Sequence, residues 1–182
     1  MRTSAEWPPE EFDPLMLPSA ENTKHRASLY ASRSGTTLGH KLGDGKDGTV
    51  WALERQSAVK AFLRPDAYAR ELACYQRLAE HGVEEVRGHA VPRLISYDHD
   101  LCIIEIEIVV APYLLDFADT YLDAAPEFPE DVIEQWHTDK LEQFGPVRWN
   151  RVQLVLATLR GQYGIYVLDV NPGNITFGEG EA

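Results

Sequence analysis

Four groups of residues, in a fixed order along the chain, carry side chains suited to handling a nucleotide phosphate. A glycine-rich run at 43–48 comes first, Lys60 follows in an apolar stretch, and Glu71 lies near the start of a patterned helix. Asp169 and Asn174 come last, in a D-x-x-x-x-N loop. Glycines let backbone N–H groups approach phosphate oxygens, and a lysine supplies positive charge. Carboxylate and amide oxygens are ligands that magnesium accepts. The chemistry these groups predict is phosphate binding and transfer.

The glycine run is predicted to connect two antiparallel strands. Alternating residues with high strand propensity occupy 37–42 and 49–53, and a third such stretch, 58–63, contains Lys60. Because the glycines neither open a helix nor precede a Gly-Lys-Ser/Thr sequence, they do not match a Rossmann or Walker loop. A plain glycine-rich hairpin turn is the alternative for this run taken alone.

A helix is predicted to follow the third strand. Pro65 and Asp66 mark its start and Gly82 its end, and an apolar stripe runs through Leu72, Tyr75, Leu78 and Ala79. Glu71 lies at the edge of that stripe, where it can reach under the sheet toward Lys60. Glu80 is the other carboxylate of this helix that could pair with Lys60. The alternative for Glu71 is an exposed helix glutamate without a specific role. Two further strands are predicted, at 91–97 and 101–110.

The C-terminal part predicts two helices followed by short strands. The first helix opens at 129–131 and ends at Gly145-Pro146; the second runs from about 147 to 161. Their apolar stripes are predicted to be core. For the first helix the stripe is Val132, Ile133, Trp136, Leu141 and Phe144. Short strands are expected at 164–168 and 175–177, on either side of the D-x-x-x-x-N loop.

Composition narrows the function classes. The 182 residues fit one domain, or one lobe and part of another, and the net charge of −12 argues against a nucleic-acid partner. No apolar run reaches the length of a membrane span, and no export signal opens the chain. Cys74 and Cys102 are expected to be buried free thiols in a reducing cytoplasm. The scattered histidines predict no zinc site.

Residues 1–35 read as an irregular arm. Prolines at 8, 9, 14 and 18 interrupt any periodic pattern, although Trp7 and Phe12 could pin the arm to the body of the protein. The remaining chain is expected to divide into a sheet-containing part, 36–110, and a mainly helical part, 111–182.

Taken together, the ordered motifs resemble the protein-kinase-like superfamily, and in particular small bacterial kinase-like proteins. The resemblance covers roughly residues 36–117 and 163–177. It rests on Lys60, Arg70-Glu71 with Tyr75 and Leu78, Val91-Pro92-Arg93-Leu94 and the D-x-x-x-x-N loop. It implies an α+β fold with a five-stranded antiparallel N-lobe sheet and one helix, and a reduced, mainly helical C-lobe that ends just after the catalytic-loop motif.

The resemblance also implies roles for individual residues. ATP and Mg²⁺ are the implied cofactors. Lys60, positioned by Glu71, would contact the α/β-phosphates, Asp169 would orient and deprotonate the acceptor hydroxyl, and Asn174 with Asp169 would hold magnesium. Residues 107–110 would form the hinge against the adenine. The residues implied to bind the nucleotide are Gly43, Gly45, Gly48, Val50, Ala58, Lys60, Glu107 and Val109.

The chain also departs from the family pattern. Val167-Leu168 stand where many relatives carry His-Arg or His-Gly, and Asn171 stands where protein kinases place a lysine. No Asp-Phe-Gly follows Asn174, which leaves the metal site short of a carboxylate unless Glu179, Glu181 or a partner supplies one.

Three hypotheses follow from this sequence. The protein is an ATP-binding minimal kinase-like phosphotransferase of unknown acceptor, a pseudokinase that works as a nucleotide-sensing or protein-interaction module, or a scaffold without ligand. A shortened C-lobe would leave apolar surface to cover, so a protein partner or a homodimer is a further expectation.

Overall fold

The computed structural model describes residues 22–114, 117 and 119–178, which form two compact units. The first unit contains the chain up to Pro65 together with Ser96–Glu105, and the second contains Asp66–Ile95 and the chain from Ile106 onward. These units cut across the domains at 36–110 and 111–182, which stay a prediction. None of the described helices is long and apolar enough to cross a membrane.

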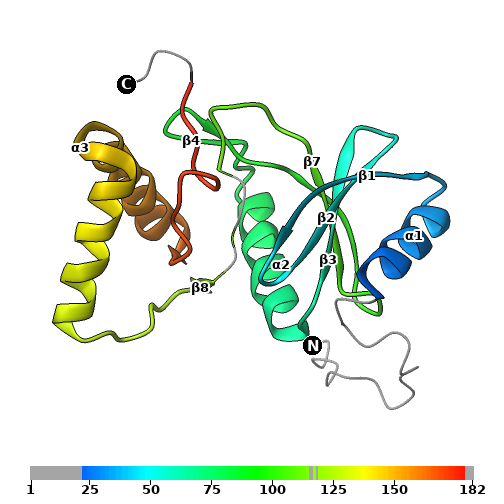
Figure 1. Ribbon diagram of the computed structural model, residues 1–182, viewed down its shortest axis with the longest axis horizontal. Coiled ribbons are helices and arrows are strands. Elements are labelled where there is room, and N and C mark those ends of the chain that lie inside the picture. The colour runs from blue at the N-terminus through cyan, green and yellow to red at the C-terminus, as the bar shows by residue number, and fades with distance from the viewer. Residues whose placement is uncertain (1–21, 115–116, 118, 179–182) are drawn as a thin grey trace. The chain divides into compact units, whose positions relative to one another are not determined.

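The first unit is built on a five-stranded antiparallel sheet, as predicted (Figure 1). Its strands lie in the order β1-β2-β3-β7-β6, and β6 and β7 continue at one end into the second unit. Their bounds are Leu38–Gly45 for β1, Gly48–Leu53 for β2, Ser57–Phe62 for β3, Leu94–Asp98 for β6 and Ile103–Glu107 for β7.

A helix that the sequence analysis missed lies in the predicted irregular arm. Thr23–Arg33 form helix α1, so the arm is irregular at most over residues 1–21, which lie outside the described residues. The signal was present, because Ala27, Tyr30 and Ala31 are spaced to share one helical face and no proline or glycine interrupts them. This face is buried in a core with Val59, Ala61 and Ile103 of the sheet, among others.

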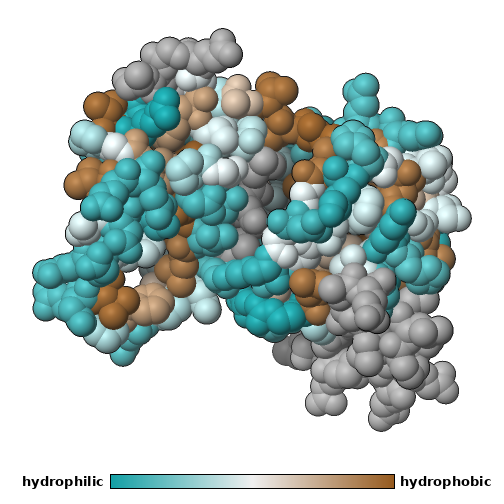
Figure 2. Space-filling view, viewed as in Figure 1, coloured by the Kyte–Doolittle hydropathy of each residue, from teal (hydrophilic) through white to brown (hydrophobic). Residues whose placement is uncertain are grey.

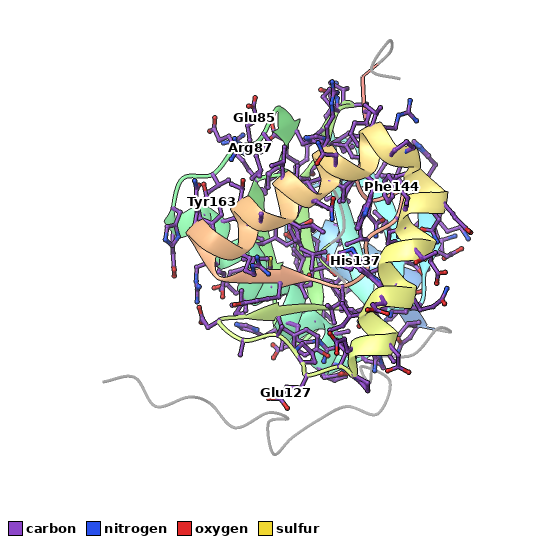
Figure 3. All side chains as sticks on the ribbon, turned by 90° about the vertical axis from the view of Figure 1, so that its left-hand side faces the viewer. Glu85, Arg87, Glu127, His137, Phe144 and Tyr163 are labelled. Atoms are coloured by element: carbon purple, nitrogen blue, oxygen red, sulfur yellow. The ribbon has the colours of Figure 1, made fainter. Side chains whose placement is uncertain are left out.

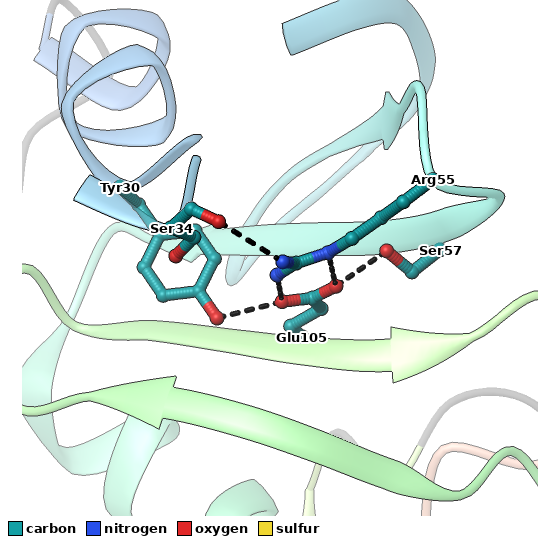
Figure 4. Close-up of polar contacts among 5 residues, drawn as sticks. All are labelled: Tyr30, Ser34, Arg55, Ser57 and Glu105. Atoms are coloured by element: carbon teal, nitrogen blue, oxygen red, sulfur yellow. Dashed lines mark hydrogen bonds and ion pairs between the residues drawn. The ribbon is translucent and has the colours of Figure 1, made fainter. Parts of the chain in front are cut away.

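A buried carboxylate joins this helix to the sheet (Figure 4). Glu105 of β7 is fully buried, and both of its oxygens accept hydrogen bonds from the Arg55 guanidinium. Ser57 of β3 donates to the same carboxylate. Tyr30 of α1 donates to it as well, over 2.7 Å. Burial alone raises the pKa of Glu105, but the hydrogen bonds from Arg55, Ser57 and Tyr30 bring it below its ordinary value. Glu105 is therefore a structural anion, whereas the sequence analysis predicted only that residues 101–110 form a strand.

Arg26 is the second polar anchor of helix α1. Its side chain is fully buried, and it donates to the backbone carbonyls of Leu101 and Phe62 and to the Asn22 side chain. Burial lowers the pKa of this guanidinium. Because those carbonyls lie just before β7 and at the end of β3, one side chain fixes the helix to two parts of the sheet.

The second unit combines helix α2, a long broken helix α3 and two pairs of short strands. The bounds are Pro65–Glu80 for α2, Glu85–Val86 for β4, His89–Ala90 for β5, Thr120–Leu122 for β8, Glu130–Tyr163 for α3 and Ile165–Val167 for β9. Helix α2 confirms the helix predicted from Pro65 to Gly82. Strand β9 confirms the one predicted at 164–168, and it pairs with β8, which was not predicted.

Helix α3 confirms the two predicted C-terminal helices, which meet at Gly145. That residue has φ 73° and ψ 162°, a conformation available essentially to glycine alone, and Pro146 opens the helical turn after it. We call residues 130–144 the first segment of α3 and residues 146–163 the second segment. Aromatic contacts join the two segments, with Trp136 5.5 Å and His137 5.7 Å from the Trp149 ring. Figure 3 labels His137 and Phe144 on the first segment.

Two predictions for this part of the chain were wrong. Trp149, Val152, Val155 and Leu159 of the second segment are buried as expected, but Val132, Ile133 and Leu141 of the first segment are 43–47% exposed. Phe144, the last residue of that predicted stripe, is buried as expected, whereas Val132 and Leu141 lie about 180° apart on the helix and do not share one face. The predicted strand at 175–177 is also absent, because Ile175 makes only an isolated bridge to Leu114.

Candidate phosphate-binding and catalytic-loop residues

The glycine run forms the tight hairpin between β1 and β2, as predicted. Gly45 is paired with Gly48, and Gly43 with Val50. The turn is tied to the end of β3: the Leu63 N–H donates to the Asp47 carbonyl over 2.8 Å, and Arg64 donates to the buried Asp47 carboxylate. The hairpin is thus anchored at its tip.

The fold requires glycine at one of the three positions, 43, 45 and 48, of the hairpin. A side chain at Gly48 would place its Cβ 2.5 Å from the Ala61 carbonyl oxygen of β3, so packing within the sheet requires glycine. At Gly43 a Cβ would meet no atom within 4 Å, and at Gly45 only the Gly48 oxygen at 3.9 Å, an ordinary contact. Neither residue has a positive φ. Within the described residues nothing demands glycine at 43 and 45, which fits a ligand approaching that backbone.

Lys60 lies in the middle of β3, opposite Val50 of β2 in the strand register. Its side chain is 8% exposed, and its ammonium is 5.0 Å from the centre of the Phe62 ring. Ala58 is buried two residues earlier, and Val50 is partly buried. The structure therefore brings the glycine hairpin, Lys60, Val50 and Ala58 together on one sheet of the first unit.

Glu71 belongs to the second unit, where it is buried in helix α2 with 3% exposure. Burial raises the pKa of the neighbouring Cys74 thiol, and the negative charge of Glu71 raises it further. Glu80, the competing carboxylate, is exposed at the end of the helix. The pairing of Glu71 with Lys60 stays a prediction.

The two cysteines are free and buried, as predicted. Burial raises the pKa of the Cys102 thiol to about 11. Neither thiol is suited to nucleophilic chemistry near neutral pH, because the thiolate is the reactive form.

The predicted hinge is partly occupied by contacts of its own. The Glu107 N–H donates to the Arg93 carbonyl over 3.0 Å, and the Glu107 carboxylate accepts from Arg93 Nε over 3.0 Å. An adenine contact through the Glu107 N–H would have to break the first of these bonds. Val109 is partly exposed just beyond the strand. The hinge role of 107–110 stays a prediction.

The D-x-x-x-x-N loop brings its two named residues together. Asn174 Nδ2 donates to the Asp169 carbonyl over 3.1 Å and to Asp169 Oδ2 over 3.3 Å. Asn171 Nδ2 donates to the other carboxylate oxygen over 3.2 Å. Two amides therefore fix the orientation of one partly exposed carboxylate.

Asn171 has a role that the sequence analysis missed. Its side-chain oxygen accepts hydrogen bonds from the N–H groups of Gly173 and Asn174, over 2.9 and 3.2 Å, which closes the turn. The signal was available, since Asn-Pro-Gly is a strong turn sequence and asparagine side chains often bond the backbone two residues on. Where protein kinases place a lysine, this chain has a residue that shapes the loop and holds Asp169.

The five-stranded sheet, the helix after its third strand and this loop are the elements that the resemblance to kinase-like proteins implied. No family model matches the sequence, and a search of curated proteins finds no matching relative. Among solved structures, the chain is similar to the aminoglycoside phosphotransferase APH(2")-IIa in its ternary complex with streptomycin and ATP, at 13% identity and a TM-score of 0.37. The match covers 85% of this chain and 42% of that one, so the chain spans less than half of that protein's length.

Proposed function

We propose that the protein binds ATP with magnesium and transfers the terminal phosphoryl group to a hydroxyl-bearing acceptor. The observation that carries the proposal is the open hairpin backbone at Gly43 and Gly45, glycines that neither φ nor packing requires among the described residues. In this proposal their N–H groups and the Lys60 ammonium bind phosphate oxygens.

In the proposed reaction Asp169 is the general base. Its carboxylate accepts the proton of the acceptor hydroxyl, and Asn171 and Asn174 hold it in one orientation for that purpose. Magnesium, when bound with the nucleotide, offsets the charge of the phosphates. Asp169 and Asn174 offer it two oxygen donors, which suits an ion that takes its other ligands from phosphates and water.

A second candidate function is a binding module that senses nucleotide or engages a protein without catalysis. One observation favours it: the described residues contain no group of three or more His, Cys, Asp or Glu side chains that could hold a metal ion. Nucleotide binding without turnover separates this candidate from the first.

Substitutions of the glycines test the phosphate site. We expect Gly43→Val to weaken ATP binding at least tenfold while leaving the free energy of unfolding within about 0.5 kcal/mol of wild type, because the added side chain meets ligand space and no protein atom. Gly48→Ala is the matched control; its clash with the β3 backbone is expected to cost about 1–3 kcal/mol of stability. Binding is measured by calorimetry and stability by urea denaturation. Unchanged ATP affinity in Gly43→Val would contradict the proposed phosphate contact.

A further inference from the structure

The first segment of α3 presents an apolar face that no described residue covers. Val132, Ile133 and Leu141 are 47%, 43% and 43% exposed, and Phe128, just before the helix, is 45% exposed. At 100° between successive residues, Val132, Trp136 and Ile133 share an arc of about 100° of the helix, whereas Leu141 lies about 180° from Val132 and outside this arc. Figure 2 shows brown, apolar side chains among teal ones over this segment.

The face is hollowed. A pocket of about 290 Å³ opens on it, lined by Phe128, Val132, Ile133, Trp136, His137 and Leu168. Five of these six side chains are apolar or aromatic, and Trp136 is held in place by its edge contact with Trp149. Interface anchors insert into pockets lined by apolar and aromatic side chains, which become desolvated when the partner binds. The pocket therefore suits an apolar side chain of a partner.

The surroundings of this face are negatively charged. From 127 to 142 the sequence carries six carboxylates and one lysine. With 100° between successive residues, Asp139 borders the face on its Val132 side, and Glu130 and Glu134 lie beyond Ile133 on the other side. All three are exposed. Lys140, the one cation, falls within the arc of Val132, Trp136 and Ile133, one turn after Trp136, and donates to Gln143 over 3.1 Å.

This charge argues against two occupants. A second copy that paired the same face would place like carboxylates opposite one another, which is unfavourable at an interface. The chain's own residues 1–21, which lie outside the described part, contain five carboxylates and one arginine. That segment would meet the same repulsion.

We propose that this face, made of Phe128, Val132, Ile133 and Trp136, binds a basic amphipathic helix of a protein partner. The apolar side of such a helix would fill the hollow, and its lysines or arginines would lie over the flanking carboxylates. This mode of recognition joins hydrophobic anchors with charges that select the partner. The proposal does not depend on nucleotide binding or catalysis.

The probe for this proposal is a fluorescein-labelled synthetic peptide of leucine and lysine in helical alternation, titrated with the full chain and followed by anisotropy. Wild type is expected to bind it saturably, and a leucine–glutamate peptide of the same pattern is expected not to bind. The double variant Val132→Ser/Ile133→Ser should bind at least tenfold more weakly. Leu154→Ser is the matched control, because Leu154 is 49% exposed on the second segment, outside the face.

A second set of variants tests the charges independently. Glu130→Gln/Glu134→Gln/Asp139→Asn keeps the apolar face, and we expect about tenfold weaker binding at low salt, with the difference shrinking as salt screens the carboxylates. Equal binding by all variants, or none by wild type, would overturn the proposal. So would a dimer in sedimentation that Val132→Ser/Ile133→Ser dissociates, or displacement of the probe by a synthetic peptide of residues 1–21.

Discussion

Replacing Arg55 by methionine is expected to destabilise the protein by about 3–5 kcal/mol, because it leaves the fully buried Glu105 carboxylate without its cation. Arg55 donates to both Glu105 oxygens, and Ser57 and Tyr30 cannot replace that charge. Because Glu105 also accepts a hydrogen bond from Tyr30 of helix α1, replacing Arg55 should destabilise the packing of this helix as well as strand β7. Urea denaturation followed by circular dichroism measures the free energy of unfolding.

Two controls make this result specific. Glu105→Gln removes the buried charge itself and keeps one acceptor oxygen, while its NH2 group cannot accept the remaining hydrogen bonds, so a smaller loss of about 1–3 kcal/mol is expected. Arg33→Met removes an exposed partner of Asp98, for which at most about 1 kcal/mol is expected. If Arg55→Met costs no more than Arg33→Met, the buried carboxylate is not the anchor that we infer.

Replacing Asp169 by asparagine is expected to reduce phosphoryl transfer 10²- to 10⁴-fold and to leave nucleotide affinity nearly unchanged, because a general base is lost while the glycine hairpin and Lys60 remain. Water is the acceptor to use while the natural one is unknown, so the measured quantity is ADP released from ATP. The aspartate and asparagine side chains differ by one polar atom. The hydrogen bond from Asn174 to the backbone carbonyl of residue 169 does not involve the carboxylate, so the variant can keep it.

Asp131→Asn is the matched control, an exposed carboxylate in the first turn of α3. It should release ADP as wild type does. If wild type binds ATP but releases ADP no faster than Asp169→Asn, Asp169 has no catalytic role. That result would favour the nucleotide-sensing or protein-interaction module.

The sequence predicted the parts of the fold that are determined locally. Alternation, the glycine turn and the proline and glycine at the ends of α2 were enough to locate β1, β2, β3 and that helix. Gly145-Pro146 likewise located the break in α3. In each case the residues that define the element are neighbours along the chain.

What could not be predicted depended on distant partners. Arg26 and Glu105 are charged residues that a sequence places at the surface, and they are buried only because carbonyls and an arginine 36 to 75 residues away satisfy them. The apolar stripe at 132–141 failed for the opposite reason. Its members span about half of the helix circumference, and whether such a wide stretch is core depends on what covers it.

The candidate site divides in the same way. The identity and spacing of Asp169 and Asn174 were enough to expect them together, and the structure places their side chains 3.3 Å apart. The role of Asn171 depends on which side-chain oxygen closes the turn, which spacing does not specify. The pairing of Lys60 with Glu71 and the hinge at 107–110 stay predictions from the resemblance.

The most direct test of the nucleotide site is a calorimetric titration of ATP into wild type and Lys60→Met, with magnesium and with EDTA. Methionine keeps the length of the buried lysine without its charge, and a thermal melt establishes that the variant is folded. We expect magnesium-dependent binding by wild type, a rise in stability of about 2.7 kcal/mol at 100 times the dissociation constant, and loss of both in the variant. A folded wild type that binds no ATP at millimolar concentration, or a Lys60→Met variant that binds as tightly as wild type, would contradict the proposed function.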